Sequence, residues 1–141
     1  MLTIKVIEGE IFNDNRGQIR SLNSFDFEGI KRMYTIFQRD VNIVRGWHGH
    51  KFERKWFYCI QGAFTLALVA PDDWENPSRT LEPNLFQISS SESKIVAVPA
   101  GFANCLKATV PDSSIMVFSD KTIQEARDDS WRYDSSMWVN W

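Results

Sequence analysis

The chain has 141 residues, 43% of them hydrophobic and 24% charged, which is enough apolar mass for the core of a single domain over residues 1–141. The formal net charge is −2 and no long run of one sign occurs, which excludes a strongly basic nucleic-acid-binding surface. No apolar run approaches the roughly 18 residues of a membrane span, and the first ten residues do not resemble a signal peptide, so we expect a cytoplasmic protein that contacts no membrane.

Strand signals dominate the chain, because short segments rich in Ile, Val, Phe and Tyr are separated by turn residues. A strand at residues 3–7 is followed by a turn at 13–17 and a returning strand at 18–23. Further strands are predicted at residues 31–38, 42–46, 55–60, 63–69, 85–89, 94–98, 104–108 and 114–119. We interpret the strands at 55–60 and 63–69 as a hairpin joined through Gln61-Gly62, with Phe64, Leu66 and Leu68 on one face.

Residues 70–83 hold three prolines and are predicted to be a loop, in which Trp74 either stacks on a nucleobase or covers the core. Residues 122–128 are the only predicted helix, since Thr122 and Glu125 have the spacing of a capping box. Many short strands with regular turns indicate an all-β fold, an antiparallel sandwich or barrel with one mouth for a ligand. We expect Cys59 and Cys105 to be buried thiols.

The only two histidines, His48 and His50, lie two residues apart, so an extended backbone directs both imidazoles to one face. Arg45 would point to the opposite face in a regular strand, although Gly46 and Gly49 can interrupt the regular alternation of side chains. One hypothesis is a metal site with Glu53 as the third ligand. The other is a metal-free proton-transfer site, which needs an imidazole, a carboxylate to orient it, and cations to hold an anionic substrate.

Four segments, taken together, resemble the cupins that act on nucleotide sugars. They are Asp14-x-Arg16-Gly17, Lys31–Tyr34, Arg45-Gly46-Trp47-His48-Gly49-His50-Lys51, and Pro99-Ala100-Gly101-Phe102-Ala103 with a closing Asp134 and Trp141. The resemblance is to the dTDP-4-dehydrorhamnose 3,5-epimerases and the dTDP-4-keto-6-deoxyhexose 3,4-ketoisomerases. It implies a cupin-type jelly-roll β-barrel, with one short C-terminal helix, that acts on a dTDP-linked 4-keto-6-deoxy sugar in the synthesis of surface polysaccharide precursors.

The resemblance also implies a role for each candidate residue. His48 is the base that removes a proton next to the 4-keto group, and Asp134 is the carboxylate that orients it. Lys55 stabilises the enolate oxygen, and His50 or Tyr34 returns the proton. The substrate-binding residues are Arg16, Arg45 and Asn104. The family further implies a homodimer, in which we expect residues 3–7 to supply an exchanged strand.

Two departures from the family pattern bear on the chemistry. The general-acid tyrosine of the epimerases falls near Met116, which has no proton to donate. Glu53 follows His50 too closely for a metal cupin, and Asn104 stands where such a cupin has a histidine, so we expect neither a metal nor another cofactor. A metal-dependent cupin that uses His48, His50 and Glu53 remains one alternative, and a non-catalytic sugar-binding cupin is the other.

Overall fold

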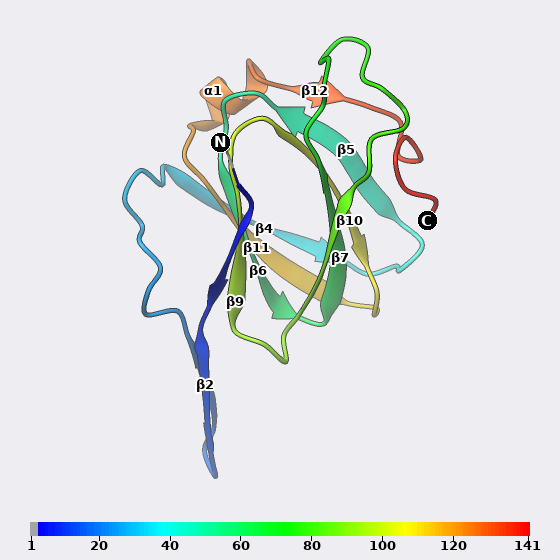
Figure 1. Cartoon of the computed structure of the whole chain (residues 1–141). Helices are drawn as coiled ribbons and strands as arrows, with labels where there is room; N and C mark the ends of the chain where they lie inside the picture. Colours follow the sequence, from blue (N-terminus) through cyan, green and yellow to red (C-terminus); the bar gives the residue numbers. More distant parts are fainter. Residues whose placement is uncertain (1–2) are drawn as a thin grey trace.

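The computed structural model, which describes residues 3–141, consists of two five-stranded antiparallel sheets that face each other (Figure 1). The first sheet has the order β1 (Lys5–Glu8), β9 (Lys94–Val98), β6 (Lys55–Gln61), β11 (Ser113–Ser119) and β4 (Arg32–Gln38). The second has the order β12 (Trp131–Arg132), β5 (Val44–His50), β10 (Phe102–Ala108), β7 (Ala63–Val69) and β8 (Asn84–Ser89). Strands β2 (Glu10–Asp14) and β3 (Gly17–Ser21) form a separate hairpin that projects from the body, and α1 spans Ile123–Arg127.

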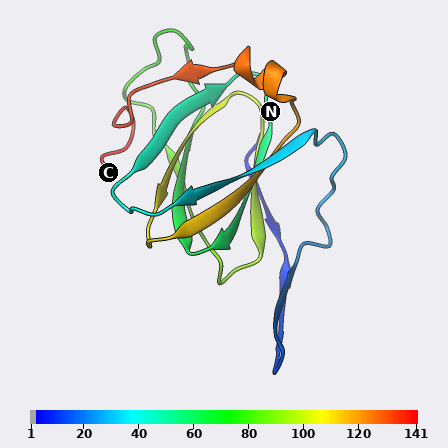
Figure 2. The same ribbon diagram turned by 180° about the vertical axis from the view of Figure 1, so that it is seen from behind.

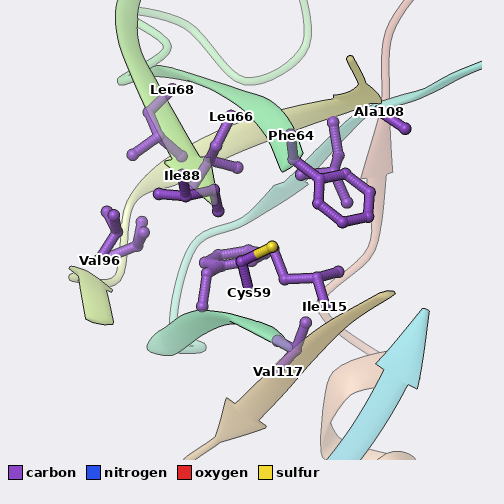
Figure 3. Close-up of a cluster of buried hydrophobic side chains, with 12 residues drawn as sticks. Cys59, Phe64, Leu66, Leu68, Ile88, Val96, Ala108, Ile115 and Val117 are labelled. Atoms are coloured by element: carbon purple, nitrogen blue, oxygen red, sulfur yellow. The ribbon is translucent and has the colours of Figure 1, made fainter. Parts of the chain in front are cut away.

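The main core lies between the two sheets, because each strand turns alternate apolar side chains inward. Phe64, Leu66 and Leu68 of β7 all belong to this core, whereas Ala67 and Val69 pack on the other side of the strand, which confirms that the three share a face. They pack with side chains from the first sheet, among them Cys59, Ile115 and Val117 (Figure 3). Both cysteines are free and buried, as predicted.

The predicted hairpin over residues 55–69 is wrong. Strand β6 pairs with β9 and β11, whereas β7 pairs with β8 and β10, so the two strands belong to different sheets. The chain crosses between the sheets at Gly62, which has φ of 74° and touches Ser113, leaving no room for a side chain. Alternation alone did not distinguish a hairpin from a crossover, because both join strands whose inner faces are apolar.

The antiparallel all-β fold and its single short helix are confirmed, but the closed barrel is not. Among residues 3–141, no hydrogen-bonded strand pair joins the two sheets. Edge strand β4 of the first sheet stays apart from β5 and β12 at the edge of the second, as the reverse view shows (Figure 2). The fold is therefore a sandwich with an open side.

The helix begins as predicted, with Thr122 and Glu125 forming a complete capping box. Within one chain, β1 pairs with β9, with Lys5 opposite Ala97, and the exchange of residues 3–7 between two chains stays a prediction. Within residues 3–141, no helix is long and apolar enough to cross a membrane.

A second apolar cluster covers the outer face of the second sheet and fixes the loop at residues 70–83. Trp47 and Trp138 pack edge to face with ring centroids 5.0 Å apart. The hydroxyl of Tyr133 donates to the carbonyl of Trp74 at 2.6 Å, and the indole of Trp74 lies against Gly49 and Trp131. Trp74 therefore covers this sheet from outside.

Candidate active site

The inner faces of the sheets change from apolar to polar along the open side. In the first sheet, Ser119 of β11 stands between Arg32 of β4 and Lys55 of β6 in one row. In the second sheet, His48 of β5 stands between Asn104 of β10 and Arg132 of β12. The fold thus places a row of polar side chains in each sheet next to the core.

A β-bulge in β5 brings Arg45 to the same side as the histidines, contrary to its sequence parity. Asn104 pairs with His48 but Cys105 pairs with Gly46, so Trp47 is the extra residue. Gly46 has φ of 135° and lies against the carbonyl oxygen of Asn104, so a side chain would not fit there. The bulge turns Trp47 outward and leaves Arg45 facing the site.

Two adjoining cavities open along this side, with volumes of about 290 and 470 Å³. Both are lined by Tyr34, His48, Lys55 and Arg132. The smaller cavity extends toward the core and is also lined by Arg45, Asn104, Ile36, Phe57 and Leu106. The larger lies beneath α1 and is also lined by Arg32, His50, Arg127, Ser130, Ile123 and Ala126. His48 is therefore central to both, while His50 faces only the larger.

The imidazole of His48 makes its hydrogen bond with Ser130, whose Oγ lies 2.8 Å from Nε2. Burial, and then the charges of His50, Lys55 and Arg132, lower the pKa of His48 to about 3. The ring is accordingly neutral near pH 7, which is the form that accepts a proton.

Asp134 is not the partner of His48 in this structure. Its carboxylate accepts hydrogen bonds from the backbone N–H and the hydroxyl of Ser136, at 2.9 and 2.6 Å, and it is exposed. These bonds lower the pKa of Asp134 and close a turn at the C-terminus. The spacing to Trp141 was a poor guide, because Asp and Ser near a chain end commonly serve as turn residues.

His50 instead has a carboxylate beside it, that of Glu53, which the sequence suggested only as a metal ligand. Its Nδ1 lies 2.8 Å from the carbonyl oxygen of Asp129 and 3.1 Å from Oε1 of Glu53. Burial first, and then the charge of Lys55, lower the pKa of His50 to about 4. The imidazole centroids of His48 and His50 are 4.3 Å apart, so the chain places two neutral bases side by side.

The set His48, His50 and Glu53 does not converge as metal ligands. Oε2 of Glu53 binds Arg32 at 2.8 Å and also the hydroxyl of Ser119, while Nε2 of His48 binds Ser130. Over the described part of the chain, no group of three or more His, Cys, Asp or Glu side chains is placed to hold a metal ion.

Lys55 and Tyr34 face the histidines from the first sheet. Lys55 is only 7% exposed, and its Nζ donates to the hydroxyl of Tyr34 at 3.0 Å. Met116 points to the outer face, because its neighbours Ile115 and Val117 take the inner one. Tyr133 is bonded to Trp74 outside the site, so Tyr34 is the tyrosine that reaches both cavities.

The structure brings most of the expected residues together, namely Tyr34, Arg45, His48, His50, Lys55 and Asn104. It leaves out Asp134. It also leaves out Arg16, which lies at the turn of the β2–β3 hairpin that projects from the body (Figure 1); there the side chain of Arg16 binds Asp14. The sequence indicated no role for Arg32, Asp129, Ser130 and Arg132, and it suggested Glu53 only as a metal ligand. Only the two-residue spacing of Ser130, just before β12, and Arg132 within it could have indicated that these two share a face.

Acidification should destabilise the protein in the window where its histidines titrate. Their folded-state pKa values lie below the ordinary value of 6.5, so the unfolded chain binds more protons and stability is lost as pH falls below about 6.5. We expect the free energy of unfolding to drop by ~1–3 kcal/mol between pH 7 and 5, measured by urea denaturation.

The matched control for this loss is the double variant His48→Asn/His50→Asn, in which the free energy of unfolding should depend little on pH between 7 and 5. Asp14, Glu125 and Asp134 have lowered pKa values, so their contributions are lost only at more acidic pH. An equal drop in the double variant would contradict the assignment to the histidines.

A family model described as FdtA, WxcM-like, C-terminal matches residues 2–137. No curated protein matches the sequence. Among similar solved structures is a dTDP-4-dehydrorhamnose 3,5-epimerase from Bacillus anthracis with TDP and pyrophosphate bound, at 19% identity and a TM-score of 0.78, covering 98% of this chain and 84% of that one.

Two further structures are described as 3,4-ketoisomerases. One is a histidine-to-asparagine variant of QdtA from Thermoanaerobacterium thermosaccharolyticum with TDP-4-keto-6-deoxyglucose, at 19% identity and a TM-score of 0.70, covering 92% of this chain and 87% of that one. The other, from Helicobacter canadensis, is 16% identical with a TM-score of 0.72, covering 97% and 96%. At these identities the likeness establishes a shared fold.

Proposed function

Since the chain belongs to the FdtA family of WxcM-like C-terminal domains, we propose that it is an isomerase acting on a dTDP-linked 4-keto-6-deoxy sugar, and that it moves the keto group between C4 and C3. The observation that carries this proposal is the pair of neutral imidazoles, His48 and His50, with centroids 4.3 Å apart. Moving a keto group requires a proton to leave one carbon and another to arrive at its neighbour, and two adjacent bases on one face suit that geometry.

The reaction begins when His48 removes the proton from C3. The electrons of that bond form a C3–C4 double bond, and those of the carbonyl move to its oxygen, which Lys55 stabilises. A proton is then delivered to C4, while the proton of the C3 hydroxyl passes to the oxygen at C4, giving the 3-keto isomer with no net change in atoms. Tyr34 delivers the proton, or His50 does so once its Nε2 has taken one up, and the hydroxyl of Tyr34 already accepts a hydrogen bond from Lys55.

The anionic part of the substrate is matched by arginines that line the cavities. Arg45 and Arg132 are suited to the diphosphate, because a guanidinium fork pairs with phosphate oxygens. Asn104 donates its amide to the carbonyl of His48 at 3.2 Å, which leaves its side-chain oxygen for a sugar hydroxyl. In this scheme His48 removes the proton and Lys55 stabilises the enediolate, so the reaction requires no metal ion.

The proposed isomerisation is tested by proton NMR of dTDP-4-keto-6-deoxyglucose incubated with the purified protein. We expect signals of the 3-keto isomer to grow at the expense of the substrate. Signals of a 3- or 5-epimer would identify the protein as an epimerase instead. A spectrum that changes only by ligand line-broadening would support the non-catalytic sugar-binding alternative.

We further propose a homodimer in which the β2–β3 hairpin contacts a second copy. Phe12 and Ile19 on this hairpin are 57% and 61% exposed. A two-stranded hairpin is only marginally stable in water, and exposed apolar side chains of this kind favour contact with another protein surface. Arg16 at its turn would then bind substrate in the partner's site, which reconciles its expected role with its position. Two buried free thiols agree with the cytoplasmic location expected for such an enzyme.

Mixing two impaired variants tests whether each active site is built from residues of both chains. Arg16→Ala should lower kcat/KM by ~10- to 100-fold, the loss expected for a charged hydrogen bond. Refolding Arg16→Ala together with His48→Asn should restore activity, because each mixed dimer has one site with both residues intact. A monomer by light scattering, or no recovery on mixing, would contradict the proposal.

A further inference from the structure

Glu53 is a buried carboxylate that the proposed reaction does not use. It lies in the turn between β5 and β6, and its side chain has no exposed surface. One oxygen, Oε2, accepts hydrogen bonds from Arg32 at 2.8 Å and from the hydroxyl of Ser119. The other, Oε1, lies 3.1 Å from Nδ1 of His50 and has no hydrogen-bond partner of its own in the described part of the chain. A buried charge is costly unless it is paired, so this arrangement calls for an explanation.

His50 presents one defined nitrogen to the larger cavity. The backbone carbonyl of Asp129, 2.8 Å from Nδ1, can only accept, so the ring proton lies on Nδ1. Nε2 is therefore the proton acceptor, and it is buried without a hydrogen-bond partner among residues 3–141. An unpaired buried acceptor beside a substrate cavity is suited to receive a proton.

The turn that holds both groups is fixed by Asp129. Its carboxylate accepts the backbone N–H groups of Lys51, Phe52 and Glu53 at 2.8, 2.8 and 3.2 Å. The same residue thus holds the ring of His50 through its carbonyl and the backbone of Glu53 through its side chain. Asp129 thus fixes the backbone from which both side chains project, while Arg32 and Ser119 hold the carboxylate of Glu53 in place.

We propose that Glu53 is a positioning residue for His50, and that Arg32 determines how much of its negative charge the imidazole feels. Bound by Arg32 and Ser119, the carboxylate leaves His50 neutral, with Nε2 ready to accept. When Nε2 receives a proton, the imidazolium forms beside Oε1, which has a free lone pair to stabilise it. The inference rests on the proposed function in one respect, that His50 transfers a proton in the reaction.

The other charged and titratable groups around His50 come from every neighbouring element. His48 lies on the same strand as His50. The first sheet contributes Arg32 and Tyr34 from β4 and Lys55 from β6. The remaining groups are Arg132 of β12, Arg127 of α1 and Asp129 in the turn after α1. Lys55 and Arg32 lower the pKa of His50, whereas Asp129 raises it. Removing Arg32 removes one opposing charge and releases Glu53 toward the ring.

A histidine titration followed by NMR tests the coupling without any substrate. The chain has only two histidines, so each ring can be assigned. We expect Arg32→Met to raise the pKa of His50 by one unit or more, because the carboxylate is then balanced by the imidazolium. We expect Glu53→Gln to keep His50 neutral over the whole accessible range. Glu92→Gln, an exposed carboxylate paired with Lys94, is the matched control and should leave the titration unchanged.

Arg32→Met leaves an unpaired buried carboxylate and is the variant most prone to misfold. The double variant Arg32→Met/Glu53→Gln removes both charges and should restore folding, with His50 neutral again. If Arg32→Met does not fold, Arg32→Lys keeps a weaker cation near Glu53 and should raise the pKa of His50 by a smaller amount.

Kinetics separates positioning from a merely structural role. Glu53→Gln should lower kcat by roughly 10²-fold with KM within about threefold of the wild type, and Glu53→Asp should recover part of the loss. The inference would be overturned if the wild-type protein is active and His50 titrates in both Arg32→Met and Glu53→Gln as it does in the wild type. An inactive protein in which Arg32→Met still shifts His50 would instead overturn the proposed function and leave the coupling intact.

Discussion

Replacing His48 with Asn should lower the rate of proton removal from C3 by roughly 10³-fold or more, since general base catalysis contributes on that order. His48 is the imidazole that lines both cavities, and burial keeps it neutral at pH 7. Asn preserves the size and one hydrogen bond to Ser130 but has no basic nitrogen. The measurement is the initial rate of deuterium incorporation at C3 of the sugar in D₂O.

The parallel variant His50→Asn is the internal control for this assignment. With His48 intact, the C3 proton should still exchange, whereas the 3-keto product should form much more slowly. The reverse outcome, with exchange lost in His50→Asn and kept in His48→Asn, would interchange the two roles. Unchanged thermal unfolding of both variants establishes that the fold is intact.

Replacing Lys55 with Met should lower kcat by ~10²–10³-fold, the loss typical for one donor to a developing oxyanion. Lys55 is 7% exposed, and within residues 3–141 its ammonium makes one side-chain hydrogen bond, to the hydroxyl of Tyr34. The variant should fold, because Met fills a similar volume without the cost of burying a charge. Steady-state kinetics and urea denaturation measure the two effects.

The same substitution has an effect that needs no substrate. Lys55 lowers the pKa of both histidines, so Lys55→Met should move both pKa values upward. Lys107→Met, on the outer face of β10, is the matched control and should change neither kcat nor the histidine titration. Full activity of Lys55→Met would contradict the role given to this lysine.

The strands themselves could be predicted from the sequence, because inward-facing apolar residues alternate clearly. The segment 31–38 becomes β4 at Arg32–Gln38, and 63–69 becomes β7 at its predicted bounds. How the strands pair could not be predicted. Residues 55–69 have the pattern of a hairpin, yet the chain crosses between sheets at Gly62, and nothing local distinguishes the two connections.

The candidate site was partly predictable for the same reason. His48 and His50 share a face because they alternate in a strand, which the sequence states directly. Arg45 shares that face only because of the bulge at Trp47, whose existence depends on pairing with β10. Glu53 and Arg32 are 21 residues apart and meet only in the folded chain, so their contact with each other was not predictable.

The error over Asp134 has a comparable origin. A carboxylate partner for an imidazole is a sound chemical expectation, but the chain offers several carboxylates and the choice among them depends on tertiary structure. The structure pairs His48 with Ser130 and places Glu53 beside His50. The carboxylate that lies beside an imidazole is therefore Glu53, three residues after His50, whereas we expected the carboxylate partner to belong to His48.

Incubation of dTDP-4-keto-6-deoxyglucose with the wild-type protein in D₂O tests the proposed chemistry most directly. If His48 and His50 move a proton between adjacent carbons, deuterium will appear at C3 of the recovered substrate and at C4 of a 3-keto product, and neither label will appear with His48→Asn. If the sugar binds but is recovered without deuterium at C3, the protein does not abstract that proton and the proposed isomerase function is wrong.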